Sequence, residues 1–280
     1  MMKNRREKVA EAIINASLGD CIVPGFNVFG YEDAQAIVKA AEELQCPVLL
    51  MTNKDACKVM PIETWGAMLS SIANNAKTIV GVHLDHCTDE NIINRAMNSG
   101  YDSVMFDGSQ LELSENIRMT CHVTKKAHDK GILVEGEVGS VPYTDRPNEI
   151  KAELTDPTHV KTFQNESNVD WVAVSIGNVH KLLKAKVSIR FDTLEQIEAV
   201  TTIPLVLHGA TGIADDEMRL LRKHRIGKVN IGTIMRYTFG NALRESVNSM
   251  PETFDRLALM KNSIQAVESK AIDLLQLLYK

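Results

Sequence analysis

The stretch TIVGVHLD, residues 78–85, is one of eight short apolar runs that decide the fold of this 280-residue chain. It is rich in Val, Ile and Leu without clean polar alternation, which is typical of a parallel strand buried on both faces. Seven further runs share this character: CIVPGFNVF (21–29), PVLLMT (47–52), SVMFDG (103–108), ILVEGEV (132–138), DWVAVSIG (170–177), PLVLHG (204–209) and GKVNIG (227–232). The sequence therefore predicts eight parallel strands.

Helical patterns separate these runs. Residues 32–44 are one example, and residues 215–223 are another, with acids at the start and bases at the end, as the helix dipole favours. Eight strands followed by helices or loops predict an α/β fold, a (β/α)8 TIM barrel. An open doubly wound sheet is the alternative, but the segment GFNVFGY (25–31) after the first strand lacks the GxGxxG turn of dinucleotide-binding sheets.

The whole chain, residues 1–280, is expected to form one barrel domain, since α/β barrels routinely reach this length. Residues 251–280 follow the eighth strand and predict extra C-terminal helices, whose apolar positions suit packing on the barrel or on a second subunit. The connections 139–155 and 178–190 are too long for simple turns, so we expect binding loops there.

Composition excludes several classes of protein. The net charge is -5 and the charged residues are interspersed, so no basic stripe for nucleic acid exists. No run of about 18 apolar residues predicts a membrane span, and the N-terminal segment has no apolar signal core. Five scattered cysteines form no CxxC pair, so neither a disulfide framework nor a cysteine zinc site is expected. We expect a cytoplasmic protein without nucleic-acid or membrane partners.

Three histidines are candidate metal ligands. His86, His180 and His208 each follow an apolar strand, and the C-terminal strand ends of a barrel meet at one rim. Imidazole suits zinc, and three protein ligands with an open fourth position define a catalytic zinc site. A single histidine at a strand end is more often structural, so the prediction depends on the three occurring together.

Seven separated motifs keep a common order along the chain: PGFNV (24–28), VHLDH (82–86), FDGS (106–109), VEGEVG (134–139), IGNVH (176–180), LVLHGATG (205–212) and KVNIGT (228–233). Together, across roughly residues 5–250, they resemble the class II fructose-bisphosphate and tagatose-bisphosphate aldolases. The resemblance implies cleavage of a phosphorylated ketose to dihydroxyacetone phosphate and an aldehyde, through a zinc-stabilised enediolate.

The resemblance also implies roles for individual residues. His86, His180 and His208 match the zinc ligands, and Asp85 matches the acid/base that moves the C4 hydroxyl proton. Asp107 and Glu137 match a second metal position, or they orient His86 as hydrogen-bond acceptors. Asp145 matches a catalytic acid of the loop after the fifth strand. The residues that match the substrate-binding positions are Asn27, Asn53, Lys181, Gly209, Thr211, Asn230 and Thr233. A monovalent cation could assist.

Departures from the family pattern concern the ends of the substrate. Lys181 replaces the family's glycine, Pro142 and Tyr143 replace a Gly-Gly pair, and Asn53 replaces a serine. Because the metal and proton-transfer groups are retained, we expect the same chemistry on a substrate other than fructose 1,6-bisphosphate. A deoxy, acidic or sulfonated tail would fit a pocket that bears Lys54 and Arg146.

Two other functions use the same residues. A metal-dependent sugar-phosphate epimerase or dehydratase could use the same enediolate. A non-catalytic sugar-phosphate-binding subunit of an aldolase complex is the second alternative, but such a subunit would tolerate loss of Asp85 or of the three histidines, all of which are present. The family resemblance and the extra C-terminal helices together imply a homodimer or homotetramer.

Overall fold

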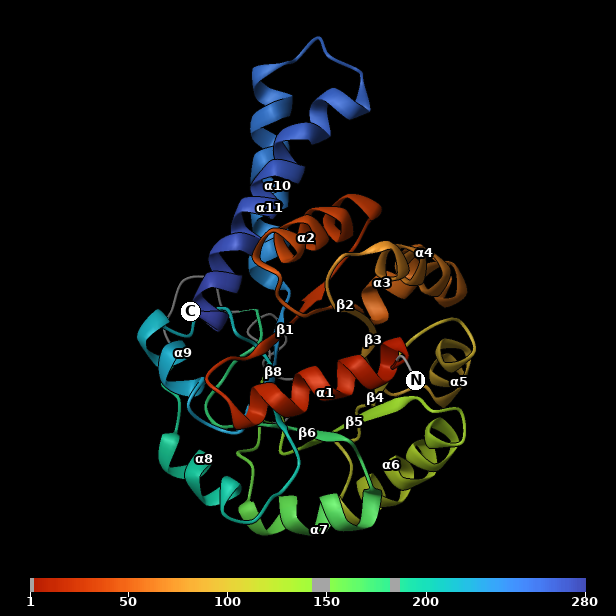
Figure 1. Cartoon of the computed structure of the whole chain (residues 1–280), viewed down its shortest axis with the longest axis vertical. Helices are drawn as coiled ribbons and strands as arrows, with labels where there is room; N and C mark the ends of the chain where they lie inside the picture. The colour runs from red at the N-terminus through yellow and green to blue at the C-terminus, as the bar shows by residue number, and fades with distance from the viewer. Residues whose placement is uncertain (1–2, 143–151, 182–186) are drawn as a thin grey trace.

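Eight parallel strands close into a barrel in the computed structural model, which describes residues 3–142, 152–181 and 187–280 (Figure 1). The strands pair in sequence order, and β1 also pairs with β8. Their bounds are β1 Val23–Asn27, β2 Val48–Thr52, β3 Val80–Cys87, β4 Ser103–Phe106, β5 Leu133–Val138, β6 Trp171–Val174, β7 Leu205–Leu207 and β8 Ile226–Ile231. All eight predicted strands are present, and the expected (β/α)8 TIM barrel is confirmed.

Helices surround the barrel, and several begin at the capping residues that their sequences supply. Asn4 and Glu7 form a capping box at the start of α1, and Asp156 caps α7 with Pro157 in its first turn. The helices are α1 Arg5–Leu18, α2 Tyr31–Leu44, α3 Lys54–Val59, α4 Ile62–Asn75, α5 Glu90–Met97, α6 Leu113–His128, α7 Pro157–Ser167, α8 Phe191–Glu198, α9 Asp215–Leu221, α10 Thr233–Ser249 and α11 Arg256–Tyr279.

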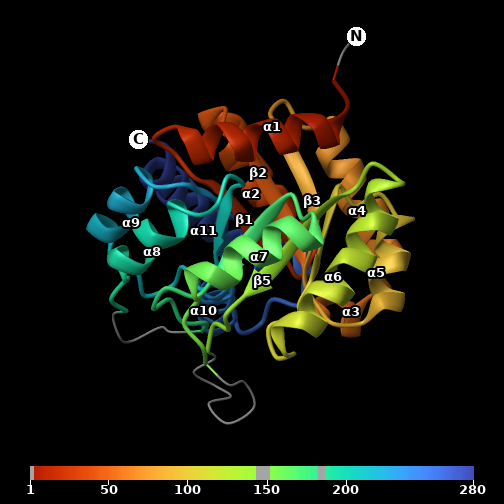
Figure 2. The ribbon, with the colours of Figure 1, turned by 90° about the horizontal axis from the view of Figure 1, so that it is seen from below.

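Helix α1 closes one end of the barrel (Figure 2). Its buried residues Val9 and Ile13 pack against Trp171 and Val206, which come from strands β6 and β7. Gly227 permits this close approach, since a Cβ there would lie 2.7 Å from the Ile13 carbonyl oxygen. Because α1 covers the end at which the strands begin, the opposite rim is the one left for a functional site.

Helices α10 and α11 extend from the barrel as a hairpin, shown in blue in Figure 1. Helix α11 also packs along α2, so the hairpin is anchored at its base. Helix α11 lies in residues 251–280, where the sequence predicts extra C-terminal helices, whereas α10 precedes that range and directly follows β8. Large apolar side chains remain exposed near the tip of the hairpin, among them Phe254 at 96% and Leu257 at 78%. In the described residues, no helix has the length and apolar character to span a membrane.

Candidate active site

The three predicted histidines converge at the C-terminal rim of the barrel. His86 is the second-to-last residue of β3, and His180 and His208 follow β6 and β7. Ring centroids lie 4.4 Å apart for His86 and His208, 5.0 Å for His86 and His180, and 5.8 Å for His180 and His208. One nitrogen of each ring lies within 4.8 Å of the other two, close enough for one ion to bind all three.

Two buried atoms beside this cluster fit a bound cation. Among the described residues, neither His208 Nδ1 nor Glu137 Oε2 has a hydrogen-bond partner, although both are buried. Burial and the neighbouring His86 hold the pKa of His208 below its usual value, so its imidazole is neutral, as a metal ligand must be. Imidazole and carboxylate donors in this arrangement suit zinc or a similar divalent ion.

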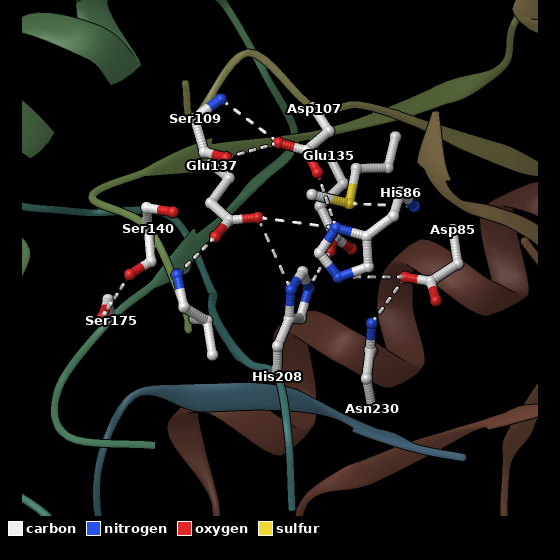
Figure 3. A network of polar contacts seen from close by, with 12 residues as sticks. Asp85, His86, Asp107, Ser109, Glu135, Glu137, Ser140, Ser175, His208 and Asn230 are labelled. Carbon is white, nitrogen blue, oxygen red and sulfur yellow. Dashed lines mark hydrogen bonds and ion pairs between the residues drawn. The ribbon is translucent and has the colours of Figure 1, made fainter. Parts of the chain in front are cut away.

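A buried hydrogen bond to Glu135 fixes the orientation of His208. Its Nε2 lies 2.8 Å from Glu135 Oε1, so Nδ1 faces the cluster (Figure 3). The other carboxylate oxygen, Oε2, accepts hydrogen bonds of 2.7 Å from Lys228 Nζ and from Trp171 Nε1. Although burial raises the pKa of Glu135, Lys228 and His208 together hold it well below the usual value. Glu135 therefore remains a carboxylate beneath the cluster.

Sequence reasoning missed the roles of Lys228 and Trp171. Lys228 is fully buried inside the barrel, in the buried strand run GKVNIG. A lysine in such a run is the signal that could have been followed, because a buried ammonium requires a carboxylate partner. Its partner Glu135 lies 93 residues away in the chain, so the sequence did not identify it.

Two carboxylate side chains lie close to Nδ1 of His86. Asp107 Oδ2 lies 2.8 Å from His86 Nδ1, and Glu137 Oε2 lies 3.8 Å from the same nitrogen. His86, Asp107 and Glu137 also form a second group with ligand atoms within 4.8 Å of one another. This geometry is compatible with both predicted roles, the orientation of His86 and a second metal position.

The protonation of this side of the cluster follows from its charges. Burial and the charge of Asp107 raise the pKa of Glu137 to about 8. Burial lowers the pKa of His86, but the carboxylates of Asp85 and Asp107 outweigh burial and raise it to about 10. In the metal-free cluster, protons on His86 and Glu137 thus offset part of the negative charge at neutral pH.

Asp85 is held by two amides. Asn27 Nδ2 and Asn230 Nδ2 each donate a hydrogen bond of 2.9 Å, one to each carboxylate oxygen. Burial alone would raise the pKa of Asp85, but His86 and His208 keep it below the usual value. Asp85 is 3% exposed, and it also lines a pocket above the histidines. An ionised carboxylate in that position can accept a proton from a bound molecule.

The pocket encloses about 660 Å³, including space open to solvent. Its lining includes all seven predicted substrate-binding residues, Asn27, Asn53, Lys181, Gly209, Thr211, Asn230 and Thr233. Lys54, which the sequence indicates only as a pocket cation, also lines it, as does Arg236, which sequence reasoning missed. Asn53 has a structural role as well, because its side-chain oxygen caps α3.

Among the pocket residues that follow β6 and β7, two have left-handed backbone conformations. Lys181 has φ +60° and Gly209 has φ +67°. A Cβ on Gly209 would lie 2.6 Å from the Val179 carbonyl oxygen, so only glycine fits there without a shift of the backbone beside His180. The amide of His180 donates a 2.8 Å hydrogen bond to the Pro142 carbonyl. The predicted catalytic Asp145, with Tyr143 and Arg146, lies outside the described residues.

A TIM barrel with a cluster of candidate metal ligands and a buried carboxylate at its C-terminal rim has the architecture of a barrel enzyme, with groups that could hold a catalytic metal. The family model described as "Fructose-bisphosphate aldolase class-II" matches residues 7–280. The chain belongs to this family and is a class II aldolase, a carbon–carbon lyase. The family resemblance seen in the sequence motifs is confirmed.

Individual relatives are similar over most of the chain. A sulfofructosephosphate aldolase from Alkalicoccus urumqiensis is 30% identical, over 83% of this chain and 82% of the relative. A 6-phospho-5-dehydro-2-deoxy-D-gluconate aldolase from Shouchella clausii (strain KSM-K16) is 31% identical, over 93% of this chain and 90% of the relative. Among solved structures, the YdjI aldolase from Escherichia coli K12 is 28% identical, with a TM-score of 0.83 over 100% of this chain and 98% of that one.

Proposed function

We propose that this aldolase cleaves a phosphorylated ketose to dihydroxyacetone phosphate and an aldehyde, with Zn²⁺ held by His86, His180 and His208. The observation that carries the proposal is the convergence of the three imidazoles, with the buried Nδ1 of His208 directed into the cluster. When bound, the ion supplies a Lewis acid that stabilises the negative charge developing on the ketone side of the breaking bond.

Asp85 moves the proton in this proposal. In cleavage, its carboxylate takes the proton of the C4 hydroxyl, the C3–C4 bonding electrons pass to the ketone half, and C4 leaves as the aldehyde carbon. A proton added at C3 then completes dihydroxyacetone phosphate. The amides of Asn27 and Asn230 support this role, because they fix both carboxylate oxygens and stabilise the ionised form.

The phosphate is proposed to bind between the ends of β7 and β8. Gly209 and Thr211 offer backbone amides there, and α10 begins at Thr233 without a side-chain cap from Gly232. An uncapped helix N-terminus at a pocket favours an anion, because its amides and its dipole both direct positive charge outward. Lys181 lines the same pocket and adds a cation next to His180.

The substrate is proposed to differ from fructose 1,6-bisphosphate at the end remote from this phosphate. The names of the two relatives describe substrates with a phosphate and a second, different acidic group, a sulfo group in one and a gluconate carboxylate in the other. The two relatives are about equally similar to this chain, which supports an acidic far end without favouring either group.

The function is tested by incubating zinc-loaded protein with a panel of ketose phosphates and trapping the triose phosphate released. Asp85→Asn is expected to lower kcat about 10²- to 10⁴-fold with little change in zinc content, since the substitution removes proton transfer but keeps the side-chain volume. Asp216→Asn, at an exposed position of α9, is the control. Bound zinc without cleavage of any ketose phosphate would refute the proposal, and isomerised products seen by NMR would indicate an epimerase.

A homodimer or homotetramer is proposed through the hairpin of α10 and α11. Phe254 and Leu257 expose large apolar surface near its tip, which a second copy would cover. Light scattering is expected to show an oligomer that Phe254→Asp dissociates. A monomer at micromolar concentration for the unmodified chain would contradict this assembly.

A further inference from the structure

Asn116 is a buried amide side chain that the proposed chemistry does not use. It lies in the first turn of α6 and is 3% exposed. Its Nδ2 donates a 2.9 Å hydrogen bond to the backbone carbonyl of Glu137, and its Oδ1 accepts a 3.0 Å hydrogen bond from Thr120 Oγ1. A buried amide that is hydrogen-bonded at both ends has one favoured orientation, so Asn116 forms a defined link between α6 and the end of β5.

This link begins where the pairing of two strands ends. The pairing of β4 with β5 stops at Met105 and Glu135, two residues before Glu137. The Leu133 amide is directed toward the β4 side, and the two-residue period directs the Glu137 carbonyl the same way. A side chain, that of Asn116, therefore takes the place of the neighbouring strand as the partner of this carbonyl.

The loop after β4 lies directly against the same amide. A Cβ on Gly108 would lie 2.2 Å from Asn116 Oδ1, so a glycine at this position leaves room for the amide. Gly108 adjoins Asp107, whose backbone amide donates a 2.9 Å hydrogen bond to the Cys87 carbonyl in β3. Asp107 is thus fixed from the β3 side, and Asn116 fixes the end of β5 relative to the same loop.

The carboxylates of these two segments meet at His86. Asp107 Oδ2 lies 2.8 Å and Glu137 Oε2 lies 3.8 Å from His86 Nδ1, and Figure 3 shows both side chains directed toward this ring. The three residues form the second group of candidate metal ligands. The separation of the two carboxylates depends on the distance between the loop after β4 and the end of β5, and Asn116 spans that distance.

We propose that Asn116 is a positioning residue for the metal cluster. Its amide holds the end of β5 against the loop after β4 and thereby sets the separation of the Asp107 and Glu137 carboxylates around His86. The inference rests on the proposed function and adds a residue through which α6 acts on the site. Replacing a residue that orients metal ligands without contacting the metal typically changes metal affinity about 10- to 100-fold.

The experiment measures zinc binding by Asn116→Ala. Competition against a fluorescent chelator should show zinc affinity about 10- to 100-fold below wild type, because the Glu137 carbonyl loses the donor that holds it. The absorption spectrum of cobalt-substituted protein, which reports ligand geometry, should shift as well. For a ketose phosphate that the wild type cleaves, excess zinc should restore kcat, and KM should change less than about threefold because Asn116 does not line the substrate pocket.

Two control variants remove hydrogen bonds of the same region. Thr124→Val removes a hydroxyl that is 1% exposed on the same helix and donates a 2.9 Å hydrogen bond to the Thr120 carbonyl. Gln110→Met removes a 2.6 Å hydrogen bond to Ser140 Oγ, which joins the same two segments beyond the carboxylates. Both variants should leave zinc affinity unchanged, even where they lower Tm.

A double variant separates packing from hydrogen bonding. Gly108→Ala/Asn116→Ala places a Cβ in part of the volume that the amide leaves, and Gly108 does not have a left-handed backbone conformation. We expect this variant to have a higher Tm than Asn116→Ala but to bind zinc equally weakly, since both lack the donor to Glu137. Gly108→Ala alone should also weaken zinc binding, because its Cβ displaces the Asn116 amide, and the two losses should not add.

Three outcomes would overturn the inference. The first is zinc affinity at the wild-type level in Asn116→Ala, and the second is an equal loss in Thr124→Val, which would show a general effect of stability. The third is recovery of zinc affinity in the double variant, which would assign the effect to packing. In all three cases the proposed function stands if the wild type cleaves a ketose phosphate. Wild-type protein that binds no zinc would overturn both, and zinc binding without cleavage would overturn the proposed function alone.

Discussion

The buried pair of Glu135 and Lys228 predicts that stability and metal affinity can be separated by mutation. Both side chains are fully buried, and their charged atoms lie 2.7 Å apart. Glu135→Gln leaves the Lys228 ammonium without a counter-charge, and Lys228→Met leaves the Glu135 carboxylate in the same state. Each single substitution is expected to lower the free energy of unfolding by about 3–5 kcal/mol, the usual cost of breaking a buried pair.

The double variant removes both charges and keeps the shape of the site. No unpaired charge remains, so the main cost of the single variants disappears, although the one glutamine oxygen can replace only one of the two acceptor atoms that Trp171 Nε1 and His208 Nε2 contact in Glu135. We expect the double variant to be at least about 2 kcal/mol more stable than either single variant, since residues in one network are strongly coupled. Its metal affinity should nevertheless stay about 10- to 100-fold low, because a neutral amide orients His208 more weakly than a carboxylate does.

Urea unfolding of the metal-free variants by circular dichroism, with zinc competition against a fluorescent chelator, measures both quantities. Glu63→Gln, at an exposed ion pair with Arg95, is the control and should change neither. Wild-type zinc affinity in Glu135→Gln would refute the positioning role of Glu135. A double variant as unstable as the two single losses added together would refute the charge-pairing argument.

Further predictions concern the metal cluster and the left-handed residues. In metal-free protein, the raised pKa values of His86 (about 10) and Glu137 (about 8) add protons to the native state, whereas the lowered pKa values of His83, His180 and His208 remove protons mainly at and below about pH 6.5. The native state therefore binds more protons above about pH 7, and its stability should fall as pH rises from 7.2 to 8. Melting scans at pH 6.5, 7.2 and 8.0 with and without zinc should show that the rise in Tm caused by zinc grows with pH. A rise in Tm that is the same at all three pH values would contradict this prediction. Lys181→Gly relieves about 1 kcal/mol of left-handed backbone strain but raises the entropy of the unfolded chain, so the free energy of unfolding should change little. The KM for ketose phosphates should rise about tenfold, because a cation is lost from the pocket. An unchanged KM would exclude Lys181 from phosphate binding. Gly209→Ala should lower zinc affinity without contacting zinc, because its Cβ would collide with the Val179 carbonyl beside His180, and chelator competition at the wild-type level would show that the loop relaxes freely.

Strand β3 shows how far its sequence determines the site. The apolar run predicts the strand, and the two-residue period places His83 and Asp85 on one face. His83 does lie inside the barrel, with its Nδ1 2.7 Å from Ser103 Oγ. The same period would direct His86 to the other face. It reaches the cluster because the pairing register shifts between Leu84 and Cys87 and because His86 adopts φ +41°. The two-residue period cannot predict such a bulge. The family motif VHLDH (82–86) identifies His86 as a candidate metal ligand directly, without reference to the backbone conformation.

The sequence predicts which polar side chains of β5 and β8 point into the barrel, but it does not predict which of them contact one another. The two-residue period directs Glu135 and Glu137 inward, and likewise Lys228 and Asn230. Which carboxylate meets the lysine depends on the stagger of strands across the barrel, which no local pattern encodes. Arg236 was missed for a related reason, since only the placement of α10 over Phe29 brings it to the pocket.

The carboxylates at this rim have separate tasks because each has a different partner. Lys228 neutralises the charge of Glu135 at one carboxylate oxygen, and the other oxygen forms a hydrogen bond with His208. One oxygen of Asp107 forms a hydrogen bond with His86. Among the described residues, Asp85 receives hydrogen bonds from two neutral amides, and the His86 ring nitrogen lies 4.0 Å from its Oδ1, so of the three carboxylates it has the weakest ion pairing. A divalent ion bound by the histidines would displace the protons of His86 and Glu137 and would leave Asp85 ionised beside it. The arrangement therefore reserves one base for the substrate, and a substitution that gives Asp85 a cationic partner, such as Asn230→Lys, should abolish proton transfer even if zinc still binds.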